Sequence, residues 1–355
     1  MTNRTPENIN IGIFGGGQLG DMLSRAAQNL GYKTTIFTND KNSPAIKNST
    51  NYILSSYQDK KNLLKFAEEV DIATLEFENI PSESIDFIEK HCPIFPNSRV
   101  LSIAKDRLLE KSFMAKNNIK TTRFSSVNNQ DNFLEQLQKF NYQAILKTNQ
   151  MGYDGRGQYL IKDRNYLPEI NFYKEKYILE EFVPFEKEIS VMIVRDQLGV
   201  TSCYDPLENK HKNGILDTSS YPAIISDKTR NNAKIIAQKI IENLDMVGLL
   251  GVEFFVLKGG ELLVNEIAPR PHNSGHFSMD GAETCQFEQL IRVICKLPLG
   301  NVDFNKKGYM KNLVGDDVLK IDKLTNGQSY KTYLYNKKEI KPGRKMGHIN
   351  FINND

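Results

Sequence analysis

The chain of 355 residues lacks several features that mark whole classes of protein. Its four cysteines, Cys92, Cys203, Cys285 and Cys295, show no CxxC spacing, which argues against a zinc site or a disulfide framework and favours buried thiols. The start MTNRTPENIN has no apolar signal-peptide core, and no apolar run approaches the roughly 20 residues of a membrane span. We therefore predict a cytoplasmic protein without membrane contact.

An excess of one charge is missing too. The 46 Lys and Arg against 43 Asp and Glu leave a net charge of +3, and the basic residues are scattered, so nucleic-acid binding is not implied. There is no internal repeat or low-complexity linker. The length suits two or three domains at roughly 150 residues each, and their boundaries must come from the pattern of elements.

The first hundred residues alternate short apolar runs with helical stretches. Helices are expected over residues 19–30 and 61–69. Strands are expected over residues 9–14, 34–37, 52–54, 72–75 and 94–95. This βαβ series predicts a mostly parallel sheet.

The sequence CPIFPNS at residues 92–98 interrupts this alternation, and a helix expected over 102–117 opens a second domain. From Ala144 on, strands dominate until an amphipathic helix expected over 232–244. After Leu299 the chain turns to short strands and polar turns. We predict divisions at residues 1–104, 105–185, 186–300 and 301–355.

The segments LLGVEFFVLKGG and ELLVNEIAPRPHNSGH read as a β-hairpin with Gly259 and Gly260 at its turn. A two-residue turn pairs Lys258 with Glu261. Counting back along both strands then places Glu253 opposite Glu266, with Cβ atoms roughly 5 Å apart. Two carboxylates so close suit a shared Mg²⁺. The alternative is an exposed hairpin with two solvated acids and a register slipped by one.

The first βα turn, GGGQLG at Gly15 to Gly20, matches GxGxxG and offers backbone N–H groups to a phosphate. Three interpretations stay open: a dinucleotide site with Asp40 as the ribose ligand, a site for another phosphorylated substrate, or glycines needed only for packing. In TLEFEN, Glu76 and Glu78 follow a strand at the sheet edge that binds ligands, unless they are ordinary solvated acids.

The stretch MGYDGRGQ follows Lys147 at the end of an apolar strand. Its glycines free backbone N–H groups to wrap phosphate oxygens, and no Walker A motif is present. Further on, YILEEFVPFEKEIS holds an apolar strand that breaks near Glu180, followed by Glu188. This segment suits adenine and ribose contacts. A surface hairpin and a domain linker are the respective alternatives.

Together, the glycine turn, Lys147, MGYDGRGQ, LEEFV with Glu188, and paired Glu253 and Glu266 resemble the ATP-grasp superfamily. Within it, the chain resembles the N5-carboxyaminoimidazole ribonucleotide synthetase family, in order over residues 12–349. The motifs that carry this resemblance are GGGQLG, TLEFEN, GYDGRGQ, NEIAPRPHNSGH, QFEQLIR, LPLG and PGRKMGH.

The resemblance implies a mixed α/β and α+β fold with an N-terminal parallel-sheet domain, a small lid domain, a catalytic ATP-grasp domain and a β-rich C-terminal segment. It implies that ATP, with Mg²⁺ or alternatively Mn²⁺, phosphorylates bicarbonate to carboxyphosphate. The carboxyl group then passes to the amine of 5-aminoimidazole ribonucleotide in purine biosynthesis. It also implies a homodimer that passes its product to a mutase.

The resemblance assigns roles by position, with Glu253 and Glu266 as the metal ligands. The nucleotide positions are Arg107, Lys147, Gly152, Tyr153, Asp154, Gly155, Arg156, Gly157, Gln158, Glu180, Glu181, Phe182, Val183, Glu188, His211, Asn265 and Glu266. The substrate positions are Gly17, Gln18, Leu19, Glu78, Asp154, Arg270, His272, Asn273 and Lys345. Catalytic roles fall to Arg270, His272, Lys345, Tyr153 and Arg156.

Three other functions remain open: a nicotinamide-dependent oxidoreductase, a nucleotide-binding regulator without turnover, and a formate-using glycinamide ribonucleotide transformylase of the same superfamily. Two departures from the family pattern stand out. Met151 occupies a position where the family often has glycine, and the chain ends at Asp355 soon after RKMGH. Met151 affects the entry to the lid, and the early end at Asp355 affects how the C-terminal segment completes the fold.

Overall fold

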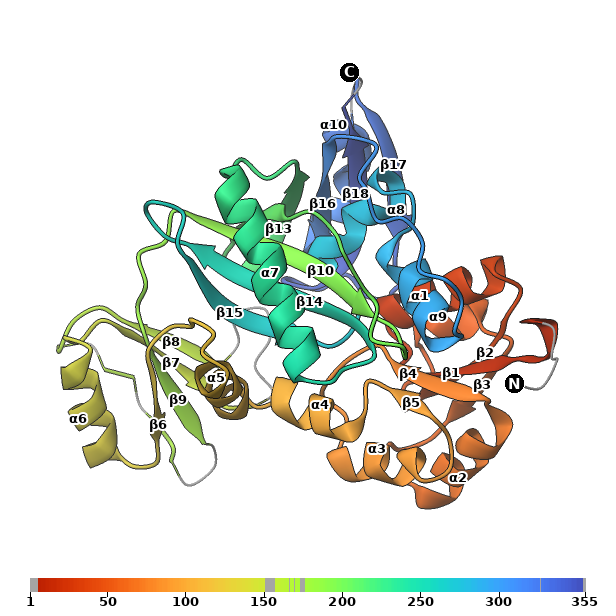
Figure 1. Cartoon of the computed structure of the whole chain (residues 1–355), viewed down its shortest axis with the longest axis horizontal. Coiled ribbons are helices and arrows are strands. Elements are labelled where there is room, and N and C mark those ends of the chain that lie inside the picture. The colour runs from red at the N-terminus through yellow and green to blue at the C-terminus, as the bar shows by residue number, and fades with distance from the viewer. Residues whose placement is uncertain are drawn as a thin grey trace.

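The computed structural model describes residues 6–150, 157–165, 167–168, 170–172, 176–325 and 327–353. They form three β-sheets, with a small sheet and the N-terminal sheet at opposite ends of the long axis and a large sheet between them (Figure 1). The N-terminal sheet is parallel, in the order β3-β2-β1-β4-β5, which confirms the predicted alternation. Its elements are β1 Asn10–Phe14, α1 Gln18–Asn29, β2 Lys33–Thr38, η2 Pro44–Asn48, β3 Asn51–Leu54, α2 Lys60–Glu69, β4 Ile72–Leu75, α3 Ser82–Glu89 and β5 Ile94–Phe95, preceded by η1 Pro6–Asn8.

The single helix expected over residues 102–117 is wrong, because two helices occupy this region: α4 Ser98–Ala104 and α5 Arg107–Lys116. The helix is interrupted because the side chain of Asp106 caps a new helix. This side chain accepts hydrogen bonds from the N–H groups of the second and third residues of α5. The N–H of Arg107 donates to the carbonyl of Asn149 at 2.9 Å. The break therefore ties the start of α5 to the small sheet.

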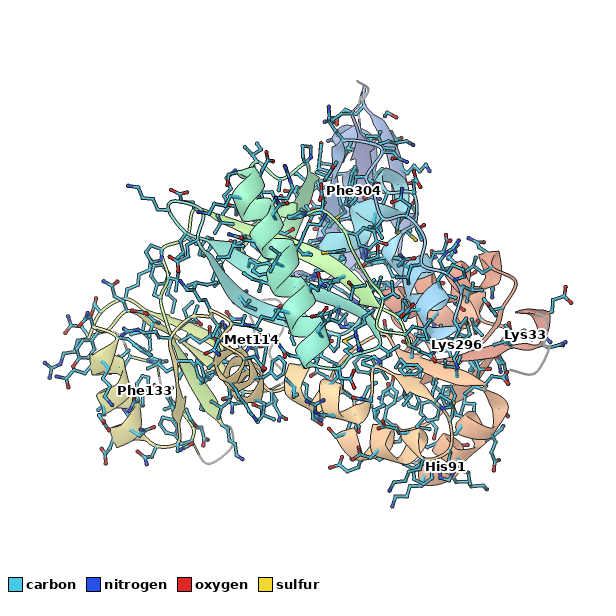
Figure 2. The ribbon with its side chains drawn as sticks, in the orientation of Figure 1. Lys33, His91, Met114, Phe133, Lys296 and Phe304 are labelled. Atoms are coloured by element: carbon cyan, nitrogen blue, oxygen red, sulfur yellow. The ribbon has the colours of Figure 1, made fainter. Side chains whose placement is uncertain are left out.

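The small sheet is antiparallel, in the order β6-β9-β7-β8, with α6 against it (Figure 1). Phe133 of α6 belongs to the core between this helix and the sheet, apart from Met114 of α5, which belongs to the core of the large sheet (Figure 2). Its elements are β6 Phe124–Val127, α6 Gln130–Lys139, β7 Ala144–Thr148, β8 Gln158–Ile161 and β9 Tyr177–Glu181.

The large sheet has nine antiparallel strands in the order β15-β14-β10-β12-β13-β16-β18-β17, with β11 beside β10. Helix α7, Asp227–Asn243, crosses β10 and β14 (Figure 1). It starts before the expected residue 232 because Ser226 caps it, accepting from the N–H of Thr229. The strands are β10 Lys187–Arg195, β11 Thr201–Cys203, β12 Leu207–Lys212, β13 Ile215–Tyr221, β14 Gly248–Val256, β15 Leu262–Ala268, β16 Gly308–Val314, β17 Ser329–Leu334 and β18 Lys345–Ile352.

Helix α9 joins the large sheet to the N-terminal sheet. Its residues Phe287 and Leu290 share a hydrophobic core with Leu19 and Leu23 of α1. No helix among the described residues is long and apolar enough to cross a membrane. Cys92 is a buried free thiol, as predicted, whereas the other three cysteines are free but only half-buried. The remaining elements are η3 Asn273–Phe277, α8 Ser278–Gly281, α9 Gln286–Ile294, η4 Gly315–Lys320 and α10 Ile321–Thr325.

Candidate active site

A cavity of about 610 Å³ lies where the three sheets meet. Its walls come from the start of α1 and the segment after β4, from α5, β7 and β8, from β10 and β12, from the hairpin β14–β15, and from the start of β18. Of the predicted site residues, it brings together Gln18, Leu19, Glu78, Arg107, Lys147, Gln158, Glu188, His211, Glu253, Asn265, Glu266, Arg270, His272, Asn273 and Lys345. The predicted residues Gly152, Tyr153, Asp154, Gly155 and Arg156 lie outside the described residues.

The hairpin places Glu253 directly opposite Glu266, as predicted. The predicted two-residue turn is wrong, because the N–H of Leu257 donates to the carbonyl of Glu261 at 2.8 Å with three residues between them. A β-bulge leaves Asn265 as an extra residue on β15 and compensates for the longer turn. Two departures from a regular hairpin thus cancel, and the two carboxylates share one face.

This carboxylate pair has the chemistry of a divalent cation site. Burial, and then the charge of Glu266, raise the pKa of Glu253 to about 8. One potential ligand atom from each of Glu253, Glu266 and His272 lies within 4.8 Å of the others. Opposed, desolvated carboxylates repel unless a proton or cation lies between them, and hard oxygen ligands suit Mg²⁺. The two glutamates therefore fit Mg²⁺.

The ring of His272 lies beside this carboxylate pair. Burial, and then the charges of Arg270 and Lys345, lower the pKa of His272 to about 3, so the ring is neutral near pH 7. Its Nδ1 lies 2.8 Å from the hydroxyl oxygen of Ser274 and 3.4 Å from the backbone nitrogen of the same residue. Its Nε2 lies 3.8 Å from Oε1 of Glu253.

Lys147 is held by a buried ion-pair network that the sequence did not predict. Its Nζ lies 2.9 Å from Oε1 of Glu180, and Nζ of Lys111 lies 3.5 Å from Oε2 of the same carboxylate. The hydroxyl of Thr122 donates to Oε2 at 2.9 Å. Burial raises the pKa of Glu180, but the charges of Lys111 and Lys147 lower it overall to about 2. The Glu180 side chain thus holds the lysine that reaches the cavity.

The predicted adenine hinge continues from Glu180 through Glu181, Phe182 and Val183. None of these four residues lines the cavity formed by the described residues. The N–H of Glu181 donates to the carbonyl of Arg123 at 2.9 Å, and its carboxylate pairs with the same arginine at 2.7 Å. The hinge therefore remains a prediction.

The end of the predicted phosphate lid is described at Gly157 and Gln158. A Cβ on Gly157, whose φ is +69°, would lie 2.7 Å from Oγ1 of Thr148. Gln158 pairs with Lys147 across β7 and β8 and lines the cavity. Glycine is thus required for the close approach of the two strands beside Lys147.

A carboxylate and a pair of aromatic rings line the same cavity as Lys147 and Gln158. Glu188 of β10 and His211 of β12 approach to 2.7 Å between Oε2 and Nδ1. Burial lowers the pKa of His211, but its hydrogen bond with Glu188 raises it overall. The rings of Phe185 and Phe255 stack with centroids 4.5 Å apart, and both line the cavity. This arrangement suits a nucleoside, with a flat apolar face next to a hydrogen-bonding pair.

The opposite end of the cavity is polar and cationic. Arg270 donates to both carboxylate oxygens of Glu78, with Nη2 to Oε1 at 2.9 Å. Burial raises the pKa of Glu78, but the charge and hydrogen bonds of Arg270 lower it overall. Lys345 begins β18 at the same wall. The side-chain amide of Asn273 makes no hydrogen bond with the described residues. Asn273 lines the cavity, where a polar ligand would satisfy its donor and acceptor.

The glycine turn of β1–α1 is occupied by a side chain of the protein itself. The carboxylate of Glu76 accepts from the N–H of Gly17 at 2.8 Å and from that of Gly20 at 3.2 Å. These are the N–H groups that a dinucleotide phosphate would take. Asp40 accepts from the N–H of Asn42 in its own turn at 2.8 Å. In this structure Glu76 therefore takes the place that a dinucleotide phosphate would need, and Gly17 itself does not line the cavity.

Two glutamines of QFEQLIR connect the motifs of the C-terminal half. The amide of Gln286 accepts from the N–H of His272 at 2.9 Å and donates to its carbonyl at 2.8 Å. Gln289 makes the same two contacts with Gly300 of LPLG, each at 2.9 Å. Sequence reasoning used QFEQLIR only as a family motif. It also missed Lys111, although four-residue spacing places it on the helix face of Arg107.

Comparisons with known proteins agree with this architecture along the whole chain. Residues 9–105 match the ribonucleotide synthetase preATP-grasp domain, residues 112–287 the ATP-grasp domain, and residues 308–355 the phosphoribosylaminoimidazole carboxylase C-terminal domain. The chain is 41% identical to the N5-carboxyaminoimidazole ribonucleotide synthase of Brucella melitensis, over 96% of each protein. It is 40% identical to that of Bacillus subtilis, over 96% of this chain and 91% of the relative.

Solved structures give the same result. The N5-carboxyaminoimidazole synthetase of Staphylococcus aureus, in complex with ADP, superposes with a TM-score of 0.94 at 33% identity, covering 99% of this chain and 95% of that one. The sequence identity over nearly the whole length, the matched domains and the shared fold lead to one conclusion. The chain belongs to the N5-carboxyaminoimidazole ribonucleotide synthase family of ATP-grasp proteins.

Proposed function

We propose that the protein is an ATP-dependent carbon–nitrogen ligase that carboxylates 5-aminoimidazole ribonucleotide in purine biosynthesis. The observation that carries this proposal is the set of groups that line one cavity. Lys147, the Glu188–His211 pair, the opposed carboxylates Glu253 and Glu266, and the polar loop with Arg270 and His272 all face it. A nucleotide and a second substrate thus meet across the carboxylate pair.

The reaction has two steps. A bicarbonate oxygen attacks the γ-phosphorus of ATP, the bond to the bridging oxygen breaks, and ADP leaves with carboxyphosphate formed. The amine nitrogen of the aminoimidazole then attacks the carboxyl carbon, the carbon–oxygen bond to phosphate breaks, and the amine loses a proton. Both steps move negative charge, so their transition states need fixed positive groups in a site that excludes water.

The residues at the ATP end supply that field. Lys147 is fixed by Glu180 at 2.9 Å, and Arg107 is fixed by its guanidinium hydrogen bond to the carbonyl of Thr148 at 3.0 Å. Charges that are already held in place cost little reorganisation during phosphoryl transfer. Mg²⁺, held by Glu253 and Glu266, would neutralise charge on the β- and γ-phosphates.

The other end holds the acceptor. Arg270 is oriented by its two hydrogen bonds to Glu78, and Asn273 lines the same cavity. His272 is neutral near pH 7, so it offers the acceptor a hydrogen bond rather than a charge. Lys345 lines the same cavity and supplies a cation for the acceptor's phosphate.

We further propose that residues 1–104 bind the acceptor, 105–185 form the lid, 186–300 carry the metal ligands, and 301–355 complete the acceptor site. Support for the last assignment comes from β16 and β18, which extend the large sheet and carry Lys345 into the cavity. We also propose a cytoplasmic homodimer. Its carbamate product would pass to the mutase that moves the carboxyl group from nitrogen to carbon.

The decisive test is ADP release by the purified protein with each reactant omitted in turn. We expect ADP formation only when both bicarbonate and 5-aminoimidazole ribonucleotide are present. Turnover with formate and glycinamide ribonucleotide instead would establish the transformylase alternative. Binding of NADPH, without nucleotide-dependent ADP release, would revive the oxidoreductase.

Replacing Lys345 by alanine is expected to raise the KM for the aminoimidazole ribonucleotide about 10-fold to 100-fold, because the variant loses one charged hydrogen bond to this substrate. The KM for ATP should stay nearly unchanged. The matched control is Lys341→Ala, because Lys341 is exposed and pairs only with Glu339 among the described residues. Initial rates with each substrate varied in turn give both constants. A variant with weakened ATP binding and normal acceptor binding would move Lys345 to the nucleotide side.

A further inference from the structure

Two neighbouring side chains of α5, Glu110 and Lys111, contact the outer edge of β15 on either side of Glu266. Oε1 of Glu110 accepts a hydrogen bond from the N–H of Ile267 at 2.5 Å. Nζ of Lys111 donates to the carbonyl of Asn265 at 2.8 Å. Because β15 is the edge strand of the large sheet, these backbone groups face away from β14. The helix side chains act where a further strand would otherwise bind.

The spacing of the outward-facing groups is that of a bulged strand. The N–H of Val264 also faces outward and donates to the carbonyl of Lys120 at 2.9 Å. In a regular strand, N–H groups on the same side alternate and lie two or four residues apart. Val264 and Ile267 lie three apart, because Asn265 is the extra residue of the bulge. Glu110 therefore reaches the N–H of Ile267 only in the bulged form.

The bulge decides which residue opposes Glu253. Near the turn, Phe254 pairs with Val264. If that register continued without a bulge, Asn265 would lie opposite Glu253. With the bulge, Glu266 takes that position. A shift by one residue would replace a carboxylate by an amide and turn Glu266 to the other face.

The packing of α5 gives these two side chains a fixed reach. Glu110 is 3% exposed and Lys111 is 1% exposed. Met114, one turn further along α5, lies in the same hydrophobic core as Val264 of β15 (Figure 2). The ammonium of Lys111 is also 3.5 Å from the carboxylate of Glu180. Helix α5 thus packs against β15 through apolar contacts and is joined to the small sheet by an ion pair.

We propose that Glu110 and Lys111 are positioning residues that hold β15 in its bulged register and so place Glu266 opposite Glu253. The inference rests on the proposed role of these two carboxylates in cation binding. Neither side chain needs to touch substrate for this role. Each acts through the backbone next to Glu266.

The test compares Glu110→Leu with Glu110→Gln in the full-length protein. Glutamine keeps an oxygen acceptor for the N–H of Ile267, whereas leucine keeps the volume and loses the acceptor. With Mn²⁺ as the probe, followed by electron paramagnetic resonance, E110L is expected to bind about 10-fold to 100-fold more weakly. E110Q is expected to recover most of that affinity, and the Ile267 amide to exchange faster with solvent only in E110L.

Two outcomes of the Glu110 comparison would overturn the proposal. Equal losses in E110Q and E110L would mean that the charge of Glu110, and not its acceptor oxygen, serves the cation. Unchanged Mn²⁺ binding and Ile267 exchange in E110L would mean that the bulge does not depend on this contact.

A second pair of variants tests Lys111. Lys111→Met removes the donor inside the protein, and Lys116→Met makes the same change at an exposed residue of α5. K111M is expected to lose Mn²⁺ affinity, whereas K116M keeps it; equal affinities would contradict the proposal. If K111M fails to fold, the Glu110 pair decides. Mn²⁺ binding with these dependences but without bicarbonate-dependent ADP release would overturn the proposed function and leave this inference standing.

Discussion

Replacing Glu266 by glutamine is expected to lower turnover by about 100-fold or more while the protein stays folded. The substitution preserves size and removes one of the two charges that face each other across β14 and β15. A neutral amide is a poor ligand for a hard divalent cation that must also bind phosphate oxygens. Steady-state ADP release over a range of Mg²⁺ concentrations measures the effect, and circular dichroism checks the fold.

The matched control is Glu261→Gln in the same hairpin. Glu261 pairs with Lys120 at 2.6 Å, and its side chain is 51% exposed, so this variant is expected to turn over at the wild-type rate. Near-normal turnover of E266Q at low Mg²⁺ would show that Glu266 is no cation ligand.

Glu180→Gln is expected to lower the free energy of unfolding by about 3–5 kcal/mol at neutral pH, because it leaves Lys111 and Lys147 without their buried counter-charge. Both oxygens of Glu180 face these ammonium groups, at 3.5 and 2.9 Å. Glu181→Gln is the control, because Glu181 pairs with Arg123 near the surface, where an ion pair contributes about 0–1 kcal/mol. Urea unfolding of both variants and the wild type gives the comparison.

The dependence of this effect on pH has a definite sign. The pKa of Glu180 falls from 4.5 to about 2 in the folded protein. Its charge therefore contributes stability that is fully present above pH 4.5 and is lost as the pH falls toward 2. The difference in unfolding free energy between wild type and E180Q should shrink across that window. A difference that stayed constant from pH 6 to pH 3 would contradict the ion-pair account.

Apolar runs in the sequence were sufficient to predict the strands of the N-terminal sheet. Strands β1, β2 and β4 lie where these runs predicted them, since a strand buried on both faces needs such a run. The opposition of Glu253 and Glu266 was also predicted, but from a two-residue turn that does not exist. The longer turn and the bulge at Asn265 compensate for each other, and neither leaves a local signal in the sequence.

Only the tertiary structure decided which groups the charged side chains contact. Glu76 occupies the glycine turn from 59 residues away, and Glu78 pairs with Arg270 across 192 residues. Lys111 joins Glu180 of the small sheet to the edge of β15 in the large one. The two partners of each such contact lie on different elements or loops. The local sequence of neither partner determines how these parts of the fold are placed relative to each other. A carboxylate that the sequence predicts to be a ligand can instead cap a helix or pair with a buried cation. The sheet that packs against it decides which of these roles it has.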